Sequence, residues 1–302
     1  MSAVLVESGP DKGAPWHFGQ PFKEQQALLE GRAWVDLSHL SVIAISGADR
    51  LRWLHDLTSQ HLEALAPSTW MEALILDPQG HIEYQFLIVD DGTTSFLILD
   101  NQYKQPLIDY LTKMKFMLRV EVSDATADFA LIRIPGAQTE IGGPFELVKR
   151  NNLHARAAEL NSVATQAGIW ANEALRVAQG RMRIGFETDH KTIPNEVGVL
   201  NKSVHMQKGC YRGQETVAKV FNLGQPPRRL VMLHLDGSEV DIPAQGSDVT
   251  LDGVKVGFIG TVARHYELGT IALALIKRNT PSDALLSASG IAASQHELAS
   301  LA

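Results

Sequence analysis

The sequence contains little that could link the chain to an oxidising compartment or to a membrane. Cys210 is its only cysteine, so no internal disulfide can form, which is typical of a reducing compartment. No apolar run approaches the roughly 18 residues that a membrane-spanning helix needs. The first residues lack the basic start and apolar core of a signal peptide. We therefore expect a cytoplasmic protein with no membrane partner.

Positive charge is scarce overall and gathers in one segment. The formal net charge is −7, which argues against a globally basic surface for nucleic acids. Between positions 202 and 229, six cations accompany a single acid, Glu215. They are Lys202, Lys208, Arg212, Lys219, Arg228 and Arg229. Such a basic segment on an acidic chain points to an anionic ligand or partner, and the simpler alternative is a solvated surface loop.

The apolar pattern of the first half predicts an α+β arrangement with an antiparallel sheet. The strand-like segments are 71–77, 81–90 and 95–100, separated by turn signals. We expect the second of these turns to account fully for Asp90 and Asp91. A helix is predicted after Asp49, whose side chain is placed to cap it.

The pattern changes at Gln225. Short strand-like segments separated by glycine and aspartate turns follow, and they indicate a small antiparallel barrel or sandwich. These segments are 228–237, 247–253, 254–265 and 269–278. The tail from Pro281, rich in alanine and serine, contains no predicted element.

The single cysteine lies in a polar, bendable segment, Gln207–Thr216, QKGCYRGQET. Glycines on both sides allow tight turns and close approach to a ligand. A helix is predicted directly afterwards. Lys208, Arg212 and the helix N-terminus all favour a thiolate at Cys210. The alternative is a buried, inert cysteine. His205 and Cys210 alone are too few ligands for a zinc site, although a centre completed by another protein stays open.

Two further segments suggest ligand recognition. In IPNEVG, Pro194 and Gly198 bracket an asparagine and a glutamate in a loop, which indicates a rigid ligand-facing segment. Nearby in the sequence are Arg176, Arg181 and Arg183. Arginines in that number suit a carboxylate or a phosphate.

The segment KGCYRGQE, Lys208–Glu215, resembles the signature of the YgfZ proteins. These are folate-binding relatives of the glycine-cleavage T-protein (aminomethyltransferase) and assist iron–sulfur enzymes. Four other segments lie before and after this motif in the same order as in the family. The resemblance extends from roughly Trp34 to Ala274. The segments are VDLSHLSVIAISGADRLRWLHDLTSQ, ALRVAQGRMRIGFETD, IPNEVG and NLGQPPRRL.

The resemblance implies a GcvT/YgfZ-like three-domain cloverleaf with antiparallel sheets and a small C-terminal β-barrel. Its first α+β domain would be discontinuous, 1–37 plus 128–224, and would carry the cysteine motif. The second α+β domain would be 38–127, and the barrel 225–302. The opening at the centre would bind a tetrahydrofolate, and the basic segment would suit the glutamyl tail.

Two departures from the family pattern stand out. Where T-proteins have an acidic pair, including the catalytic aspartate, this chain offers Tyr84 and Gln85, neither of which is an ionised acceptor at neutral pH. Where the family has a glutamate suited to the pterin, this chain has Ala178, with Gln179 beside it. The folate contacts predicted by the resemblance are Tyr84, Gln85, Arg176, Gln179, Glu196 and Arg228.

The function predicted from the resemblance is a folate-linked accessory factor for iron–sulfur cluster assembly or repair. It would support enzymes such as a tRNA methylthiotransferase, with Cys210 as the reactive thiol. Lys208 and Arg212 would favour its thiolate, and Gly209, Tyr211, Gly213, Gln214 and Glu215 would shape the loop or contact the partner. Its partners would be iron–sulfur assembly proteins or client enzymes, with direct tRNA binding weakly supported. The alternative is a tetrahydrofolate-dependent aminomethyltransferase or another one-carbon transferase, which the missing acids disfavour.

Overall fold

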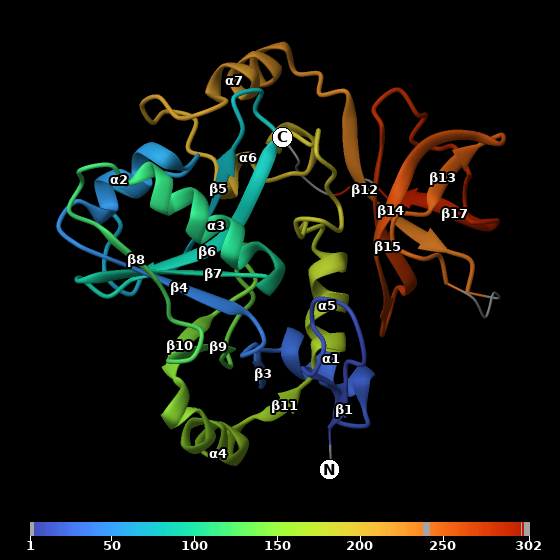
Figure 1. Cartoon of the computed structure of the whole chain (residues 1–302). Helices are drawn as coiled ribbons and strands as arrows, with labels where there is room; N and C mark the ends of the chain where they lie inside the picture. Colours follow the sequence, from blue (N-terminus) through green and yellow to red (C-terminus); the bar gives the residue numbers. More distant parts are fainter. Residues whose placement is uncertain (1–2, 238–241, 297, 299–302) are drawn as a thin grey trace. The chain divides into compact units, whose positions relative to one another are not determined.

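The computed structural model describes residues 3–237, 242–296 and 298, coloured along the chain in Figure 1. Contacts divide the chain into two compact units. Unit 1 comprises the chain up to Ile75, Tyr84–Asn172 and Gln207–Tyr211. Unit 2 comprises Leu76–Glu83, Glu173–Met206 and the chain from Arg212. The three-domain division drawn from the sequence stays a prediction.

A five-stranded sheet in the order β5-β6-β7-β4-β8 carries the main core of unit 1. The strands are β5 (Met71–Leu76), β6 (Ile82–Asp90), β7 (Thr94–Leu99), β4 (Ser41–Ser46) and β8 (Glu121–Asp124). Strand β4 pairs antiparallel with β7 and with β8. Helices α2 (Arg50–Leu57) and α3 (Asn101–Met114) contribute Leu54 and Leu107 to this core, both fully buried. The predicted strands and helices of this segment are confirmed.

A four-stranded sheet in the order β10-β9-β3-β11 forms a second layer of secondary structure in unit 1. Its strands are β10 (Phe145–Lys149), β9 (Phe129–Arg133), β3 (Ala33–Asp36) and β11 (Thr165–Ala167). Strand β11 pairs parallel with β3, an exception to the antiparallel pattern. A small sheet joins β1 (Val4–Leu5) to β2 (Pro15–His17). The associated helices are α1 (Pro21–Leu29), η1 (Arg150–Asn152), α4 (Leu153–Val163) and α5 (Ile169–Ala178).

The predicted C-terminal barrel is confirmed, and it closes in the order β12-β15-β14-β13-β16-β17. Its strands are β12 (Arg228–Leu235), β13 (Asp248–Leu251), β14 (Val254–His265), β15 (Gly269–Lys277), β16 (Leu286–Ala288) and β17 (Ile291–His296). The last two lie in the tail for which no element was predicted. In β17, Ile291 and Ala293 are buried while Ala292 is exposed. Alternation of buried and exposed positions among small residues is a weak sequence signal, yet the strand that it marks completes the barrel.

Three short helical elements connect α5 to the barrel. They are η2 (Pro194–Glu196), α6 (Leu200–Ser203) and α7 (Gln214–Leu223). The helix predicted after the cysteine motif is therefore present. None of the helices within the described residues has the length and apolar character that crossing a bilayer requires.

The capping role predicted for the Asp49 side chain is wrong. Asp49 stands at the N-cap position of α2, but its side chain accepts no capping hydrogen bond. Instead, its carboxylate accepts bonds from the guanidinium and backbone N–H of Arg119, with Nη2–Oδ1 at 2.6 Å. The side-chain bond to Arg119 is the main reason that the pKa of Asp49 is lowered to about 2.

The hairpin turn also fails to account for Asp90, whose side chain is only 1% exposed. Arg50 of α2 donates to its two carboxylate oxygens over 2.9 and 2.8 Å, and the Ser95 hydroxyl donates over 2.6 Å. Burial opposes ionisation, but these bonds outweigh it and lower the pKa of Asp90. Asp91 is exposed and accepts only local turn bonds. Asp90 therefore ties α2 to the sheet, while Asp91 shapes the turn.

Replacing Asp90 with alanine is expected to destabilise the protein by about 3–5 kcal/mol, because the largely buried Arg50 loses its counter-ion. The matched variant Asp91→Ala is expected to cost about 1 kcal/mol. Urea unfolding at neutral pH measures both. Since the folded pKa of Asp90 lies below its unfolded value, its contribution is present at neutral pH and is lost as the pH falls through the folded pKa. Equal effects of the two variants would contradict this assignment.

Candidate functional site

Lys208 is almost fully buried and holds the start of the cysteine motif against the end of α2. Its ammonium donates to the backbone carbonyls of His55, Thr58 and Gln60, the last two over 2.6 and 3.1 Å. Carbonyls at a helix C-terminus have no partner within the helix, and a cation suits the negative end of the helix dipole. Burial lowers the pKa of Lys208 to about 8. Lys208 is thus an anchor, a role that the sequence did not reveal.

Tyr211 is a second buried anchor, three residues further along. It is 7% exposed, and its ring lies with the centroid 5.4 Å from the Lys208 Nζ, within the range of a cation–π contact. Burial raises the pKa of Tyr211 to about 12, so the phenol is neutral at physiological pH. The two side chains together fix the ends of the Lys208–Tyr211 segment in unit 1.

Gly209 and Cys210 lie between these anchors, and both are exposed. The alternative of a buried, inert cysteine is therefore wrong. Lys208 directs its ammonium to three backbone carbonyls, so any effect of it on the thiol stays a prediction. The catalytic role of Cys210 also stays a prediction. Cys210 is exposed between two buried residues, so its side chain is available to a partner.

The second half of the motif rests on the turn between β5 and β6, within unit 2. Gly213 has φ +80°, and a Cβ there would lie 2.6 Å from the carbonyl oxygen of Asp77 and 2.7 Å from Cα of Gly80. The preceding Arg212 forms an ion pair with Glu83, with Nη1–Oε2 at 3.0 Å. Only glycine fits such a backbone contact at positive φ. The motif glycine is thus explained by close packing against a turn.

Helix α7 begins directly after Gly213. Gln214 and Glu215 occupy its first turn, where the exposed Glu215 carboxylate suits the positive end of the dipole. Among the apolar residues of this helix, Val217 is buried, but Phe221 is 48% exposed. The helix is confirmed, and its apolar face is only partly covered.

The basic segment does not form a free basic patch, because the protein uses most of its charge internally. Lys208 lies on carbonyls and Arg212 on Glu83, as described above. Arg229 donates to the carbonyl of Thr280 and to the side chain of Gln295. Among the remaining cations of the segment, Lys219 is exposed to solvent. The expectation of a basic face for an anionic partner therefore loses most of its support.

Arg228 and Glu196, both predicted folate contacts, bind each other. The Arg228 guanidinium donates to Glu196 over 2.8 and 2.7 Å and to Asp189 over 2.7 Å. Glu196 is 1% exposed, and one of its oxygens also accepts the backbone N–H of Ile193. Burial raises the pKa of Asp189, but the bonds from Arg228 outweigh it and lower that pKa to about 2. An ion pair therefore joins the IPNEVG loop to the barrel.

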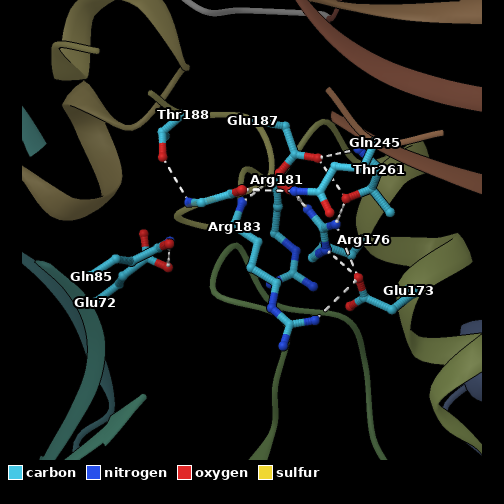
Figure 2. Close-up of polar contacts among 11 residues, drawn as sticks. Glu72, Gln85, Glu173, Arg176, Arg181, Arg183, Glu187, Thr188, Gln245 and Thr261 are labelled. Carbon is cyan, nitrogen blue, oxygen red and sulfur yellow. Dashed lines mark hydrogen bonds and ion pairs between the residues drawn. The ribbon is translucent and has the colours of Figure 1, made fainter. Parts of the chain in front are cut away.

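Arg176 is the centre of a second buried network (Figure 2). Its guanidinium donates to Glu173 over 3.0 Å, to Glu187 over 3.1 Å and to the hydroxyl of Thr261. Glu187 is fully buried and also accepts the backbone N–H of Thr261 over 2.8 Å. The network joins α5 to strand β14. The remaining predicted contact, Gln179, accepts from Arg181 over 3.1 Å.

The residues that replace the acidic pair of T-proteins lie on strand β6. Successive strand residues point to opposite faces, and Tyr84 packs on the core of unit 1 with its ring 6.0 Å from that of Tyr110. Gln85 instead donates from Nε2 to the carboxylate of Glu72 on β5 over 3.0 Å (Figure 2). Sequence reasoning missed Glu72. Its signal was an acid inside the otherwise apolar strand MEALIL.

The described residues contain no group of three or more histidine, cysteine, aspartate or glutamate side chains that could hold a metal ion.

Comparisons with known proteins place this geometry in context. Residues 11–141 match the family described as the GCVT N-terminal domain. A chloroplastic protein of Arabidopsis thaliana, named as a transferase, is 26% identical over 303 residues, which cover 85% of this chain and 68% of the relative. A mitochondrial iron–sulfur cluster assembly factor IBA57 homolog of Mycosarcoma maydis is 24% identical, with coverage of 77% and 65%. The tRNA-modifying protein YgfZ of Colwellia psychrerythraea is 21% identical, with coverage of 77% and 81%.

The matches support a GcvT-like protein. The crystal structure of glycine cleavage system aminomethyltransferase T from Bartonella henselae superposes with a TM-score of 0.82 at 16% identity, over 98% of this chain and 93% of that one. This similarity establishes the GcvT-like fold. It also confirms the fold class expected from the cysteine motif and its companion segments.

Replacing Lys208 with methionine is expected to destabilise the GcvT-like fold by roughly 2–4 kcal/mol, because buried carbonyls at the end of α2 lose their donor. The control is Lys219→Met, an exposed lysine on α7, with an expected change within about 0.5 kcal/mol. Thermal and urea unfolding measure both variants. A Lys208→Met protein as stable as the control would show that the carbonyl contacts contribute nothing.

The two motif glycines give a second matched pair. Gly213→Ala is expected to cost about 2 kcal/mol or more, since the new Cβ would overlap the Asp77 carbonyl in a left-handed backbone. Gly209→Ala meets no atom within 4 Å, so a change within about 1 kcal/mol is expected. Calorimetry distinguishes the two. Similar melting temperatures would overturn the packing role of Gly213.

Proposed function

We propose that this protein is an accessory factor for iron–sulfur cluster assembly or repair and that Cys210 is its reactive group. The observation that carries the proposal is the exposed thiol between two buried anchors, Lys208 and Tyr211. Relatives named for iron–sulfur cluster assembly and for tRNA modification support it. An exposed thiol suits cluster handling, since thiolates are the usual ligands of iron–sulfur clusters.

The chemistry of a single thiolate limits what the protein can do alone. Thiolates are soft ligands that suit iron in clusters, but a cluster is normally held by four such ligands. Cys210 would therefore act as one transient ligand or redox group, and the other ligands would come from an assembly protein or a client enzyme. An enzyme that modifies tRNA with a sulfur group, such as a methylthiotransferase, is the client class that we propose. This places tRNA downstream of the protein, without direct binding.

The proposed alternative, aminomethyl transfer, lacks a suitable base at the position expected for it. Tyr84 faces the core, and the amide of Gln85 is not a proton acceptor of the required kind. Glu72 is a carboxylate on the neighbouring strand, but it accepts a hydrogen bond from Gln85. We therefore rank the transferase second.

A bound tetrahydrofolate, implied by the family, does not fit the contacts predicted in unit 2. Its glutamyl tail needs an available guanidinium, but Arg176 and Arg228 each bind two carboxylates of the protein itself. Its pterin needs an acceptor, and Ala178 provides none. Among the predicted folate contacts, Gln85 comes closest to supplying the acceptor that a pterin needs, because its partner Glu72 has a carboxylate. The role proposed for Cys210 accordingly includes no step on folate, and fluorescence titration of the tryptophans with tetrahydrofolate tests binding separately.

Replacing Cys210 with serine is expected to abolish support of an iron–sulfur enzyme, since a hydroxyl is a poor ligand for iron and is not oxidised as a thiol is. The measurement is methylthio-modified tRNA in cells that lack the chromosomal gene and carry either variant. Because Cys210 is exposed, stability should change by less than about 0.5 kcal/mol.

The control for this experiment is Ser282→Ala, a substitution of an exposed residue outside the motif, expressed to the same abundance. Full restoration of tRNA modification by Cys210→Ser would refute the thiol mechanism. Turnover of an aminomethyl donor by purified protein with tetrahydrofolate would favour the transferase instead.

A further inference from the structure

Three consecutive large apolar residues lie exposed at one loop tip in unit 1. The loop follows α3 and leads into β8, and its tip is Phe116, Met117 and Leu118. Their exposed fractions are 79%, 99% and 44%. Isolated exposed apolar residues are ordinary, but a contiguous group marks an interaction surface. We refer to Phe116–Leu118 as the apolar tip.

The apolar tip is held in place at both ends. The backbone N–H of Leu118 donates to the carbonyl of Lys115, and the N–H of Val120 donates to the carbonyl of Leu118, both over 2.9 Å. Before the tip, the indole of Trp53 donates to the carbonyl of Met114 over 3.2 Å. Phe116 adopts φ +43°, a conformation uncommon for a large side chain. The chain therefore presents these side chains to solvent from a fixed reversal.

After the tip, Arg119 fixes the chain to the start of α2. Its guanidinium and backbone N–H bind the carboxylate of Asp49, with distances of 2.6 to 3.0 Å. The carbonyl of Arg119 lies where a side chain on Gly47 would begin, 2.0 Å from a Cβ built there. Gly47 thus permits the close approach that positions the loop.

Cations surround the apolar tip. Lys113 is exposed in the last turn of α3, Lys115 precedes the tip, and Arg119, 75% exposed, follows it. Arg52, on the outer side of α2, is exposed and close enough to Asp49 to contribute to the lowered pKa of that carboxyl. The nearby acids are Asp49, which pairs with Arg119, and the exposed Glu121, and the exposed Asp109 and Asp56 lie one helical turn further away along α3 and α2. From Lys113 to Glu121 the chain carries three cations and one acid, although the whole chain has a net charge of −7.

We propose that the apolar tip docks this protein on the surface of an anionic lipid bilayer. The three side chains would enter the boundary between headgroups and acyl chains, and the flanking lysines and arginines would meet the lipid phosphates. The exposure of Met117 on nearly all sides indicates a projecting feature, which inserts into a layer and offers no pocket for a ligand. Long cationic side chains suit this place, because their stems are apolar and their ends stay in water.

No apolar run of the sequence is long enough to span a bilayer, which predicts no membrane partner. The length of the longest apolar run says nothing about docking on the membrane surface, because three residues at a loop tip can insert without a spanning segment. The inference is independent of the proposed function, because neither the tip nor its flanking cations include Cys210.

The test is co-sedimentation of the full-length protein with vesicles of phosphatidylcholine mixed with phosphatidylglycerol. The wild type should pellet with these vesicles and much less with vesicles of phosphatidylcholine alone. The double variant Phe116→Ser/Met117→Ser is expected to weaken binding by about tenfold or more. Lys113→Glu/Lys115→Glu should weaken it similarly, and raising the salt from about 50 mM to about 500 mM should weaken the wild type.

Matched controls keep the result specific. Val163→Ser removes an apolar residue that is 79% exposed elsewhere in unit 1, and Lys149→Glu reverses an exposed lysine on β10. Both should bind like the wild type, and Cys210→Ser should as well. Unchanged melting temperatures verify that the tip variants fold. A wild type that stays in the supernatant, or tip variants that pellet equally, would overturn membrane docking, and the first result would leave the tip to a protein partner.

Discussion

The ammonium of Lys208, placed on the carbonyls at the end of α2, is the contact on which the arrangement of the motif depends. The carbonyls replace the water that would otherwise solvate the ammonium. In return, the ammonium supplies hydrogen-bond donors to carbonyls that the helix leaves unsatisfied. Lys208 is held inside the protein, the next two residues are exposed, and Tyr211 returns the chain to the interior. The exposed Cys210 is thus held in place by the two buried side chains that flank its segment.

Ion pairs between side chains of the same chain are the second feature that organises the molecule. The arginines that appear in the sequence as candidates for an anionic ligand are already bound by acids of the same chain. Arg228 binds Asp189 and Glu196, and Arg176 binds Glu173 and Glu187. Glu173 lies three residues before Arg176 on the same helix, while the other three acids reach their arginines from separate segments of the chain. A buried pair of this kind specifies one arrangement of loop and barrel, since breaking it leaves an isolated charge in the interior.

Much of the fold could be predicted from the sequence, because the strands of the central sheet and of the barrel are apolar runs between clear turn signals. Strand β17 could not, since its buried positions are filled by small residues that also suit loops. For the site, the sequence indicated the thiol and its glycines correctly as a bendable segment. It could not show that Lys208 points inward or that Asp90 is buried, because both depend on α2, which meets them only in the folded chain. Glu72 was missed for the same reason: its partner is on the next strand.

The single exposed cysteine has a practical consequence. With only one sulfhydryl in the chain, every mixed disulfide and every thiol-directed label is at Cys210. The only disulfide that two copies can form without a further thiol joins Cys210 to Cys210, which makes a covalent dimer. The fraction of such dimers on a non-reducing gel therefore reports disulfide formation between two Cys210 thiols, without spectroscopy or a reporter group.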